Sequence, residues 1–301
     1  MSLFWDKECG ILNTETKMKR KISDLLLANH IDCFGFLPLS ACQIKKPYLL
    51  EKADIKDGTA ILFAMPYYTT ECDGEKNISA YAVAKDYHLY FKELTDKLLA
   101  ILKEQFPHHR FAAFADHSPI DERTAACMAG LGVIGQHGLL ITKKYSSYVF
   151  IGEILTDAIL DCEVSEPSDC ERCGACLRAC PMTKKETDIC LSALTQKKGT
   201  LSEQEQEVML RYGSVWGCDI CQEVCPHTIK AKADGTLYSP IPFFSEDRVC
   251  VLTSKRLLAM DDDIFAKRAY SWRTREVIMR NLLLSETAHE SKAPIKKQFK
   301  N

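Results

Sequence analysis

The chain has 301 residues, enough for two domains of ordinary size or for one large and one small domain, and its 46% hydrophobic residues predict a substantial core. A formal net charge of −2 excludes a globally basic nucleic-acid binder but not a local basic patch. The first residues carry acids and lack the apolar core of a signal peptide, and the longest apolar run is too short to span a bilayer. We therefore expect a cytoplasmic protein without a membrane segment, in which 15 cysteines indicate metal binding or catalysis rather than disulfides.

The first third of the chain shows an α/β pattern. Apolar periodicity predicts a short helix over residues 21–29 and strands over residues 33–37 and 59–65. Apolar residues at spacings of three and four predict a helix within residues 79–105, and a further strand follows at residues 110–115.

The next stretch begins with a helix start and ends in strands. Ser118 is a plausible N-cap followed by Pro119, and the helix is expected to end at Gly130. The segment GLGVIGQHG is interpreted as a glycine-rich loop, and two strands joined by a turn are predicted at residues 138–142 and 147–155.

A shift to Asp, Glu, Ser and Pro after residue 156 predicts a domain boundary. Helical patterns lie at residues 200–212 and 254–284, and the last eleven residues are interpreted as a frayed basic tail. The predicted fold class is α+β, with an α/β domain over residues 1–157, a cysteine-rich module over residues 158–240 and a helical segment over residues 241–301.

The cysteine-rich module begins with the run C-x2-C-x2-C-x3-C-P that is typical of bacterial ferredoxins. Gaps of two residues let a tight loop place three thiolates around one cubane, and Gly174 permits a close approach of the backbone. In proteins with two clusters the fourth cysteine of such a run binds the other cluster.

A second set of four cysteines resembles the first run with its leading member moved upstream, and it also ends in Cys-Pro. The crossed rule then predicts two [4Fe–4S] clusters. The predicted ligands of cluster one are Cys170, Cys173, Cys176 and Cys225, and those of cluster two are Cys180, Cys190, Cys218 and Cys221. Structural zinc is the alternative, since C-x2-C pairs also bind zinc, but the complete ferredoxin run argues against it.

Two neighbouring clusters transfer electrons without defining a reaction. Either the first 155 residues or a partner protein must accept those electrons. Asp116 is a candidate functional residue in this part of the chain, because it follows an apolar strand and precedes a helix start, where α/β folds place functional groups. A carboxyl group beside a bulky apolar cofactor can act as a general acid. The alternative is a loop aspartate that caps a turn.

Several segments together resemble the epoxyqueuosine reductase family, over nearly the whole chain. These segments are ISAYAVAKDYH at 78–88, FADHSPIDERTAACMAGLGVIGQHGLLI at 114–141, YVFIGEILTD at 148–157, LTQKKG at 194–199, WGCDICQEVCP at 216–226 and RAYSWRTREVIMRN at 268–281. The resemblance implies an oxidoreductase of queuosine biosynthesis and tRNA processing. Its N-terminal domain, related to reductive dehalogenases, holds cobalamin, and its ferredoxin-like module reduces the cobalt. The epoxide oxygen of epoxyqueuosine in tRNA is then removed, with Asp116 at the position of the proton donor.

The same resemblance places further residues near ligands. Lys85, Leu140, Ile151, Ser192 and Asp219 are the implied cobalamin contacts, although Leu140 and Ile151 suit a plain core equally well. Lys198 and Gly199 match a pair that touches tRNA, and Lys198 could also be a solvated turn residue. His88 and His137 are interpreted as hydrogen-bonding residues rather than cobalt ligands.

Some features depart from the family pattern. Gln136 stands where lysine is usual, Ala84 stands where glycine is usual, and only nine residues separate Cys180 from Cys190. The chain is expected to be a short form without the C-terminal helical-repeat domain. A basic face that could bind phosphates is one hypothesis for the C-terminal part, and an ordinary solvated helix face is the other. Its residues would be Lys267, Arg268, Arg273, Arg275 and Arg280.

The expected partners are a tRNA substrate and an external electron donor such as a flavodoxin or ferredoxin, with no membrane partner and an oligomeric state left open. Two other functions stay open from the residues alone. One is a dehalogenase-like, cobalamin-dependent reductase of a small molecule, and the other is a two-cluster electron carrier whose N-terminal domain is degenerate.

Overall fold

The computed structural model describes residues 13–181 and 189–292, and it divides into two compact units. The first unit contains the described parts of residues 1–64, 94–131 and 151–166, and the second contains those of residues 65–93, 132–150 and 167–301. Both units draw on separate stretches of the chain, so the domain boundaries at residues 157 and 240 stay a prediction. Among the described residues, no helix combines the length and the apolar character needed to cross a bilayer.

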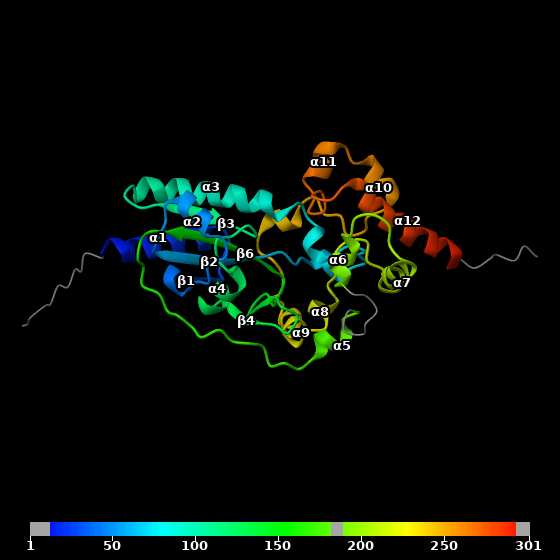
Figure 1. Ribbon diagram of the computed structural model, residues 1–301, viewed down its shortest axis with the longest axis horizontal. Helices are drawn as coiled ribbons and strands as arrows, with labels where there is room; N and C mark the ends of the chain where they lie inside the picture. Colours follow the sequence, from blue (N-terminus) through cyan, green and yellow to red (C-terminus); the bar gives the residue numbers. More distant parts are fainter. Residues whose placement is uncertain (1–12, 182–188, 293–301) are drawn as a thin grey trace, which may run out of the picture. The chain divides into compact units, whose positions relative to one another are not determined.

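The first unit is built around a four-stranded sheet in the order β1-β2-β6-β3 (Figure 1). The strands are β1 (Phe34–Pro38), β2 (Thr59–Pro66), β6 (Val149–Thr156) and β3 (Phe111–Phe114). Every residue of β2 is buried, as its uninterrupted apolar sequence predicts. In the antiparallel pairing of β3 with β6, Phe114 lies opposite Glu153. Asp116 follows two residues after Phe114.

The helices of the first unit are short apart from the first. They are α1 (Thr14–Ala28), α2 (Pro47–Ala53) and α4 (Glu122–Met128). Helix α4 packs against β1. Helix α3 (Tyr87–Gln105) begins in the residues of the second unit and ends in those of the first. A 3₁₀ turn at Leu39–Ala41 follows β1. Asn13 caps α1 by accepting a hydrogen bond from the Thr16 amide at 2.8 Å.

The second unit combines a small sheet with many short helices. Strands β4 (Gly132–Ile134) and β5 (Leu140–Thr142) pair antiparallel. The helices are α5 (Ala175–Ala179), α6 (Leu191–Thr195), α7 (Glu203–Tyr212), α8 (Ile220–Glu223), α9 (Pro226–Ala233), α10 (Ser254–Ala259), α11 (Asp262–Ala266) and α12 (Arg275–Lys292), with 3₁₀ turns at Thr70–Asp73, Ala80–Ala82 and Pro242–Ser245.

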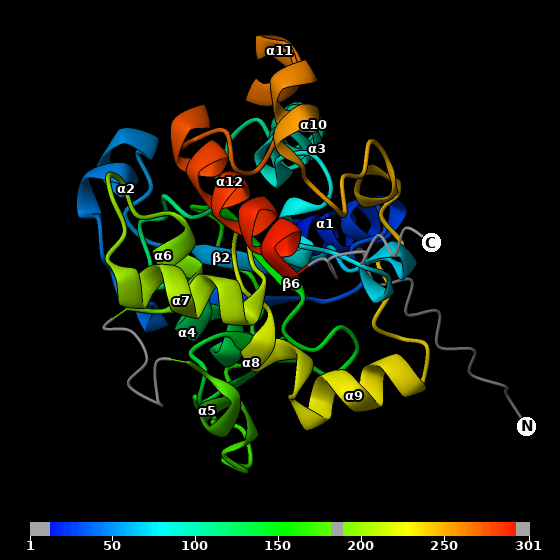
Figure 2. The same ribbon diagram turned by 90° about the vertical axis from the view of Figure 1, so that its right-hand side faces the viewer.

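Helix α12 lies against α6, α7 and α10 (Figure 2). Its buried Asn281 donates hydrogen bonds to the carbonyls of Thr195 at 2.7 Å and Val215 at 2.9 Å. Arg280 donates to the Lys197 carbonyl at 2.8 Å and, through two nitrogens, to the side-chain oxygen of Asn281. The closing helix is therefore tied by polar contacts to the segments on either side of α7.

The α+β class is confirmed, and several predicted elements need correction. The helix expected within residues 79–105 begins only at Tyr87, and the helical stretch at residues 254–284 is three separate helices. The glycine-rich segment after Gly130 contains strand β4. Helix α4 is capped by Asp121 instead of Ser118, because the Ser118 hydroxyl accepts from the Ile120 amide at 2.9 Å and closes a turn before the helix. The predicted frayed tail lies almost entirely outside the described residues.

Candidate functional site

The four cysteines expected at cluster one surround one small cavity in the second unit. Cys170, Cys173, Cys176 and Cys225 line it. Burial raises the pKa of the Cys225 thiol, and the Cys173 and Cys176 thiols raise it further. Such a group can carry four thiolates only when a cationic centre compensates their charge, which is what iron ions supply. These side chains therefore fit a [4Fe–4S] cluster.

The loop that carries these cysteines is shaped by a left-handed backbone. Gly174 has φ +75° directly before α5, and a Cβ atom there would lie 2.9 Å from the Arg178 guanidinium. The Gly174 amide donates to the Gln136 side-chain oxygen at 3.2 Å. Gln136 thus supports the loop that carries the cysteines of cluster one.

His137 also lines the cavity of the first four cysteines. Its Nδ1 accepts a hydrogen bond from the Leu139 amide at 3.2 Å, which assigns the ring proton to Nε2. Burial lowers the pKa of His137, and the nearby His227 lowers it further, so the ring is neutral near pH 7. His88 donates from Nδ1 to the Asp86 carboxylate at 2.8 Å. Both histidines are hydrogen-bonding residues, as expected.

The other four cysteines form a second group. Burial, together with the neighbouring thiols Cys190 and Cys180, raises the pKa of the Cys218 thiol to about 12. The pKa of Cys221 rises to about 12 for the same reasons. The crossed pattern of the sequence thus brings the eight side chains together as two groups of four. The short loop between Cys180 and Cys190 lies largely outside the described residues.

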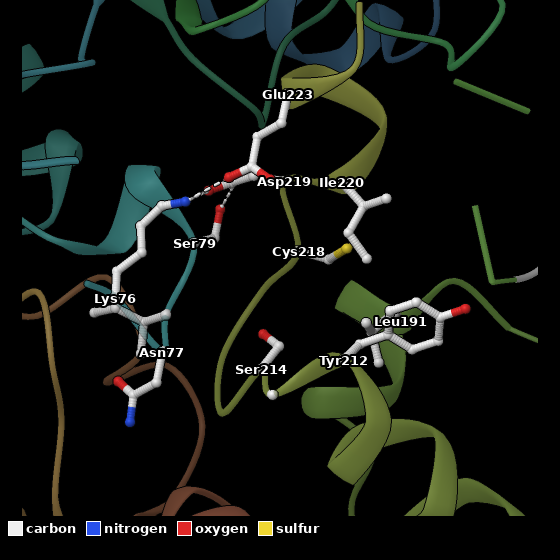
Figure 3. A pocket seen from close by; sticks show the side chains of 12 residues that line it. Lys76, Asn77, Ser79, Leu191, Tyr212, Ser214, Cys218, Asp219, Ile220 and Glu223 are labelled. Carbon is white, nitrogen blue, oxygen red and sulfur yellow. Dashed lines mark hydrogen bonds and ion pairs between the residues drawn. The ribbon is translucent and has the colours of Figure 1, made fainter. Parts of the chain in front are cut away.

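A buried carboxylate stands between two cysteines of the second group. Ser79 donates a hydrogen bond to one oxygen of Asp219 (Figure 3). The Ala80 amide donates to the other oxygen at 2.8 Å. Lys76 Nζ lies 3.4 Å from the Asp219 carboxylate and 2.6 Å from that of Glu223. Burial raises the pKa of Asp219, and Lys76 and these hydrogen bonds counteract that shift.

A cavity of about 160 Å³ lies beside this ion pair. Lys76 and Asp219 form a polar side of its lining, while Leu191, Tyr212 and Cys218 contribute apolar and thiol surface (Figure 3). Lys76, Ser79 and Glu223 were not identified from the sequence. No local signal could identify them, because Ser79 and Asp219 are 140 residues apart.

The other implied cobalamin contacts are placed differently. Lys85 Nζ is paired with Glu246 and Asp247, each at 3.3 Å. Leu140 is buried in the core of the second unit, whereas Ile151 on β6 is only half buried. Ser192 is half buried in α6, where its hydroxyl oxygen accepts from the Gln196 amide at 3.3 Å.

Asp116 lies in the first unit, on an exposed and strained turn that follows β3. Its φ is +56°, a left-handed value that is uncommon outside glycine. The His117 amide donates to the Ala115 carbonyl at 2.5 Å across it, which makes Asp116 the centre of a three-residue turn. Strained backbone of this kind is concentrated at functional sites.

Two carboxyl groups accompany Asp116, those of the half-buried Glu122 and the buried Glu153. The Asp116 amide donates to Glu122 Oε2 at 3.2 Å. Burial, together with the charge of Asp116, raises the pKa of Glu122 to about 7. Burial likewise raises the pKa of Glu153 to about 8, while a hydrogen bond at 2.7 Å between its Oε1 and the hydroxyl of Ser118 counteracts the shift. The sequence reasoning identified neither glutamate.

The residues expected to touch tRNA are exposed, whereas several residues of the proposed basic face contact the protein itself. Lys198 and Gly199 lie on an exposed turn that begins after α6. The buried Arg268 donates to the Asp247 carbonyl, and Arg275 donates to three carbonyls at the end of α10 and to Asp262. Together with Arg280 on the Lys197 carbonyl, three of the five basic residues make intramolecular contacts, and the phosphate-binding face stays a prediction.

Two family models match this chain. Residues 169–228 match the 4Fe-4S double cluster binding domain, so this segment is a domain for two [4Fe–4S] clusters. Residues 56–117 match the model described as epoxyqueuosine reductase QueG, DUF1730.

Curated relatives and solved structures agree with these matches. The epoxyqueuosine reductase of Gloeobacter violaceus is 31% identical over 218 residues, which are 69% of this chain and 68% of that protein. The one from Cellulophaga algicola is 31% identical over 219 residues, 69% of each chain. A crystal structure of epoxyqueuosine reductase with an epoxyqueuosine-modified tRNA-Tyr stem loop shares the fold, with a TM-score of 0.72, 24% identity and coverage of 92% of this chain and 82% of that one. This chain therefore belongs to the epoxyqueuosine reductase family.

Proposed function

We propose that this chain is an oxidoreductase that converts epoxyqueuosine to queuosine in tRNA, with electrons passing from two [4Fe–4S] clusters to cobalamin. The observation that carries the proposal is the pair of four-cysteine groups in a chain of this family. The name of the relatives states the reaction, and one protein of the same fold is known with a modified tRNA stem loop.

The cluster ligands follow from the two cysteine groups. Cluster one takes the four cysteines around the cavity that His137 also lines, and cluster two takes the second group, Cys180, Cys190, Cys218 and Cys221. Thiolates are the ligands that iron–sulfur clusters require. The buried Asp219 accepts hydrogen bonds from Ser79 and Ala80 and pairs with Lys76, which fixes the backbone beside cluster two, and its contact with cobalamin stays a prediction.

The surfaces proposed to contact cobalamin are strand residues that are only half buried. The apolar strand β4 is half buried along its whole length, and the first three residues of β6 are half buried before the strand becomes fully buried. A large, mostly apolar ring could cover such strands. Ile151 offers apolar surface for such a contact, and Ser192, in the second unit, offers a hydroxyl group. When bound, cobalamin supplies the two-electron reduction.

Asp116 is the proton donor in this proposal. Its turn projects the carboxyl group from an exposed position at the end of β3, where a substrate can reach it. A carboxylic acid there can protonate the epoxide oxygen as a carbon–oxygen bond opens. Lys198 and Gly199 would contact the tRNA from their exposed turn, and a small low-potential carrier such as a flavodoxin or ferredoxin would reduce the clusters.

The experiment is a single-turnover assay on tRNA that carries epoxyqueuosine. The chain is purified anaerobically, its iron and cobalt are counted, and nucleosides are separated by mass spectrometry after reduction. We expect queuosine from the wild-type chain and at least a hundredfold loss for Asp116→Asn, a change typical for removal of a general acid. Cobalamin retention without tRNA binding or queuosine would instead support a reductase of a small molecule, and absence of cobalamin would support an electron carrier.

A further inference from the structure

Epoxide reduction consumes more protons than Asp116 carries. Removal of the oxygen as water takes two electrons and two protons and leaves an alkene. A carboxyl group delivers one proton, and the proposed function, on which this inference rests, assigns that group to Asp116. A second proton must therefore reach the same oxygen within one turnover.

We propose that Glu122 supplies this second proton by recharging Asp116. Glu122 is then a positioning and proton-relaying residue that acts through Asp116 and does not touch the substrate.

The geometry places the two residues together within the first unit. Glu122 is the first residue of α4, and its N-cap Asp121 fixes the helix start by accepting from the Thr124 amide at 3.2 Å. From there Glu122 Oε2 accepts the hydrogen bond of the Asp116 amide at 3.2 Å. The same contact holds the strained turn, so a shift of Glu122 would also move the proton donor.

The electrostatic surroundings suit a group that gives and regains a proton near neutral pH. Burial raises the pKa of Glu122 to about 7. Among its charged neighbours, Asp116 and Asp121 raise that pKa and Arg123 lowers it. Glu153 on β6 adjoins Glu122 and stays protonated at pH 7, because burial raises its pKa to about 8. General acids work best when their pKa lies near the working pH.

The transfer balances in both protons and electrons. The Asp116 acid gives its proton to the epoxide oxygen as the first carbon–oxygen bond opens, and a carboxylate remains. Glu122 then protonates that carboxylate, and Asp116 passes the proton to the same oxygen as the second bond breaks and water leaves. The hydroxyl group left by the first step is a poor leaving group, so the second proton is transferred as its carbon–oxygen bond breaks and water departs. Glu122 regains a proton from solvent, and the two electrons come from an external low-potential donor through the clusters.

The test compares Glu122→Gln with Asp121→Asn in the holoenzyme. Glutamine keeps an oxygen for the Asp116 amide but carries no acidic proton. Asp121→Asn removes one charge at the neighbouring position and keeps an equally good helix cap. Single-turnover rates on tRNA containing epoxyqueuosine are measured from pH 6 to pH 9. We expect the wild-type rate to fall about tenfold per pH unit above pH 7. The Asp121→Asn rate should fall with the same slope from a slightly lower pH, because the charge of Asp121 raises the pKa of Glu122. Glu122→Gln should be at least tenfold slower at pH 6 and should lack this fall.

A second readout does not depend on activity. In protein labelled with ¹³C-glutamate, one carboxyl signal should titrate near pH 7, vanish in Glu122→Gln and move to lower pH in Asp116→Asn. A Glu122→Gln variant with the wild-type rate, or with a lower rate but the wild-type pH profile, would overturn the relay, as would a titration indifferent to Asp116→Asn. If the wild-type holoenzyme forms no queuosine, the proposed function fails and the relay with it, while an observed coupling of the two carboxyl groups would remain a property of the fold.

Discussion

Replacement of the buried Glu153 by glutamine should stabilise the first unit, and should do so only at neutral and higher pH. Glu153 is 1% exposed, and in the described part of the chain its second oxygen, Oε2, has no hydrogen-bond partner. Burial raises its pKa from 4.5 to about 8. The folded protein therefore keeps the proton over a pH range in which the unfolded chain releases it.

The sign follows from this difference. Below pH 4.5 the side chain is protonated in both states and the stability is at its full value. As the pH rises towards 8, only the unfolded state loses the proton, so the free energy of unfolding falls by about 1.4 kcal/mol per unit. Between 4.5 and pH 7 this amounts to roughly 3 kcal/mol. The glutamine introduced by Glu153→Gln has no such cost, and its side-chain oxygen can accept the hydrogen bond that the Ser118 hydroxyl donates to Glu153 Oε1.

Hydrogen exchange of the anaerobic holoprotein measures the effect without loss of the clusters. Under conditions in which exchange reports equilibrium opening, peptides covering β6 should exchange about a hundredfold more slowly in Glu153→Gln than in wild type at pH 7. The two proteins should differ only a few-fold at pH 5. Glu51→Gln, on the exposed face of α2, is the control and should match wild type at both pH values. An equal ratio at pH 5 and pH 7, or faster exchange in Glu153→Gln at pH 7, would refute the reasoning.

Three further changes test the second unit. Cys225→Ser should halve the iron content from about eight to about four iron ions per chain, as measured by iron analysis after anaerobic purification. The control Cys250→Ser, outside both cysteine groups, should leave the iron content unchanged. Gly217→Ala should lower the thermal midpoint well below that of Gly235→Ala, because both glycines have positive φ but only a Cβ at Gly217 meets another side chain, at 2.4 Å. Asn281→Leu should destabilise the unit by about 2 to 4 kcal/mol in denaturant unfolding, since it leaves two buried carbonyls without donors; a loss below about 1 kcal/mol would contradict this role.

The parts of the structure that local sequence determines were predictable. The spacing of the cysteines was sufficient to predict two groups of four, because cubane ligation fixes that spacing. The strand β2 is an uninterrupted apolar run, and α7 begins with a capping box in which Ser202 and Glu205 bond reciprocally.

The parts that distant contacts determine were not predictable. The Ser79 segment looks helical by periodicity, but it turns to donate to a carboxylate 140 residues away. Ser118 has the sequence signature of a cap, but its hydroxyl is held by Glu153 and Ile120 instead. The two glutamates near Asp116 are a residue of helix α4 and a residue of strand β6, and they are 31 positions apart in the chain.

The arginines of the C-terminal part have a consequence for the ionic-strength dependence of RNA binding. Each phosphate contact to a single strand contributes about −0.7 to the slope of log affinity against log salt concentration, because it releases condensed counterions. Arg268, Arg275 and Arg280 donate instead to backbone carbonyls, and Arg273 stacks its guanidinium 3.8 Å from the centre of the exposed Trp272 ring. With Lys267 and Arg273 left to face phosphates, this region would contribute a slope of only about −1.4. Aromatic stacking and shape complementarity would then supply most of the affinity of this region for an RNA loop, and that affinity would change little as the salt concentration increases.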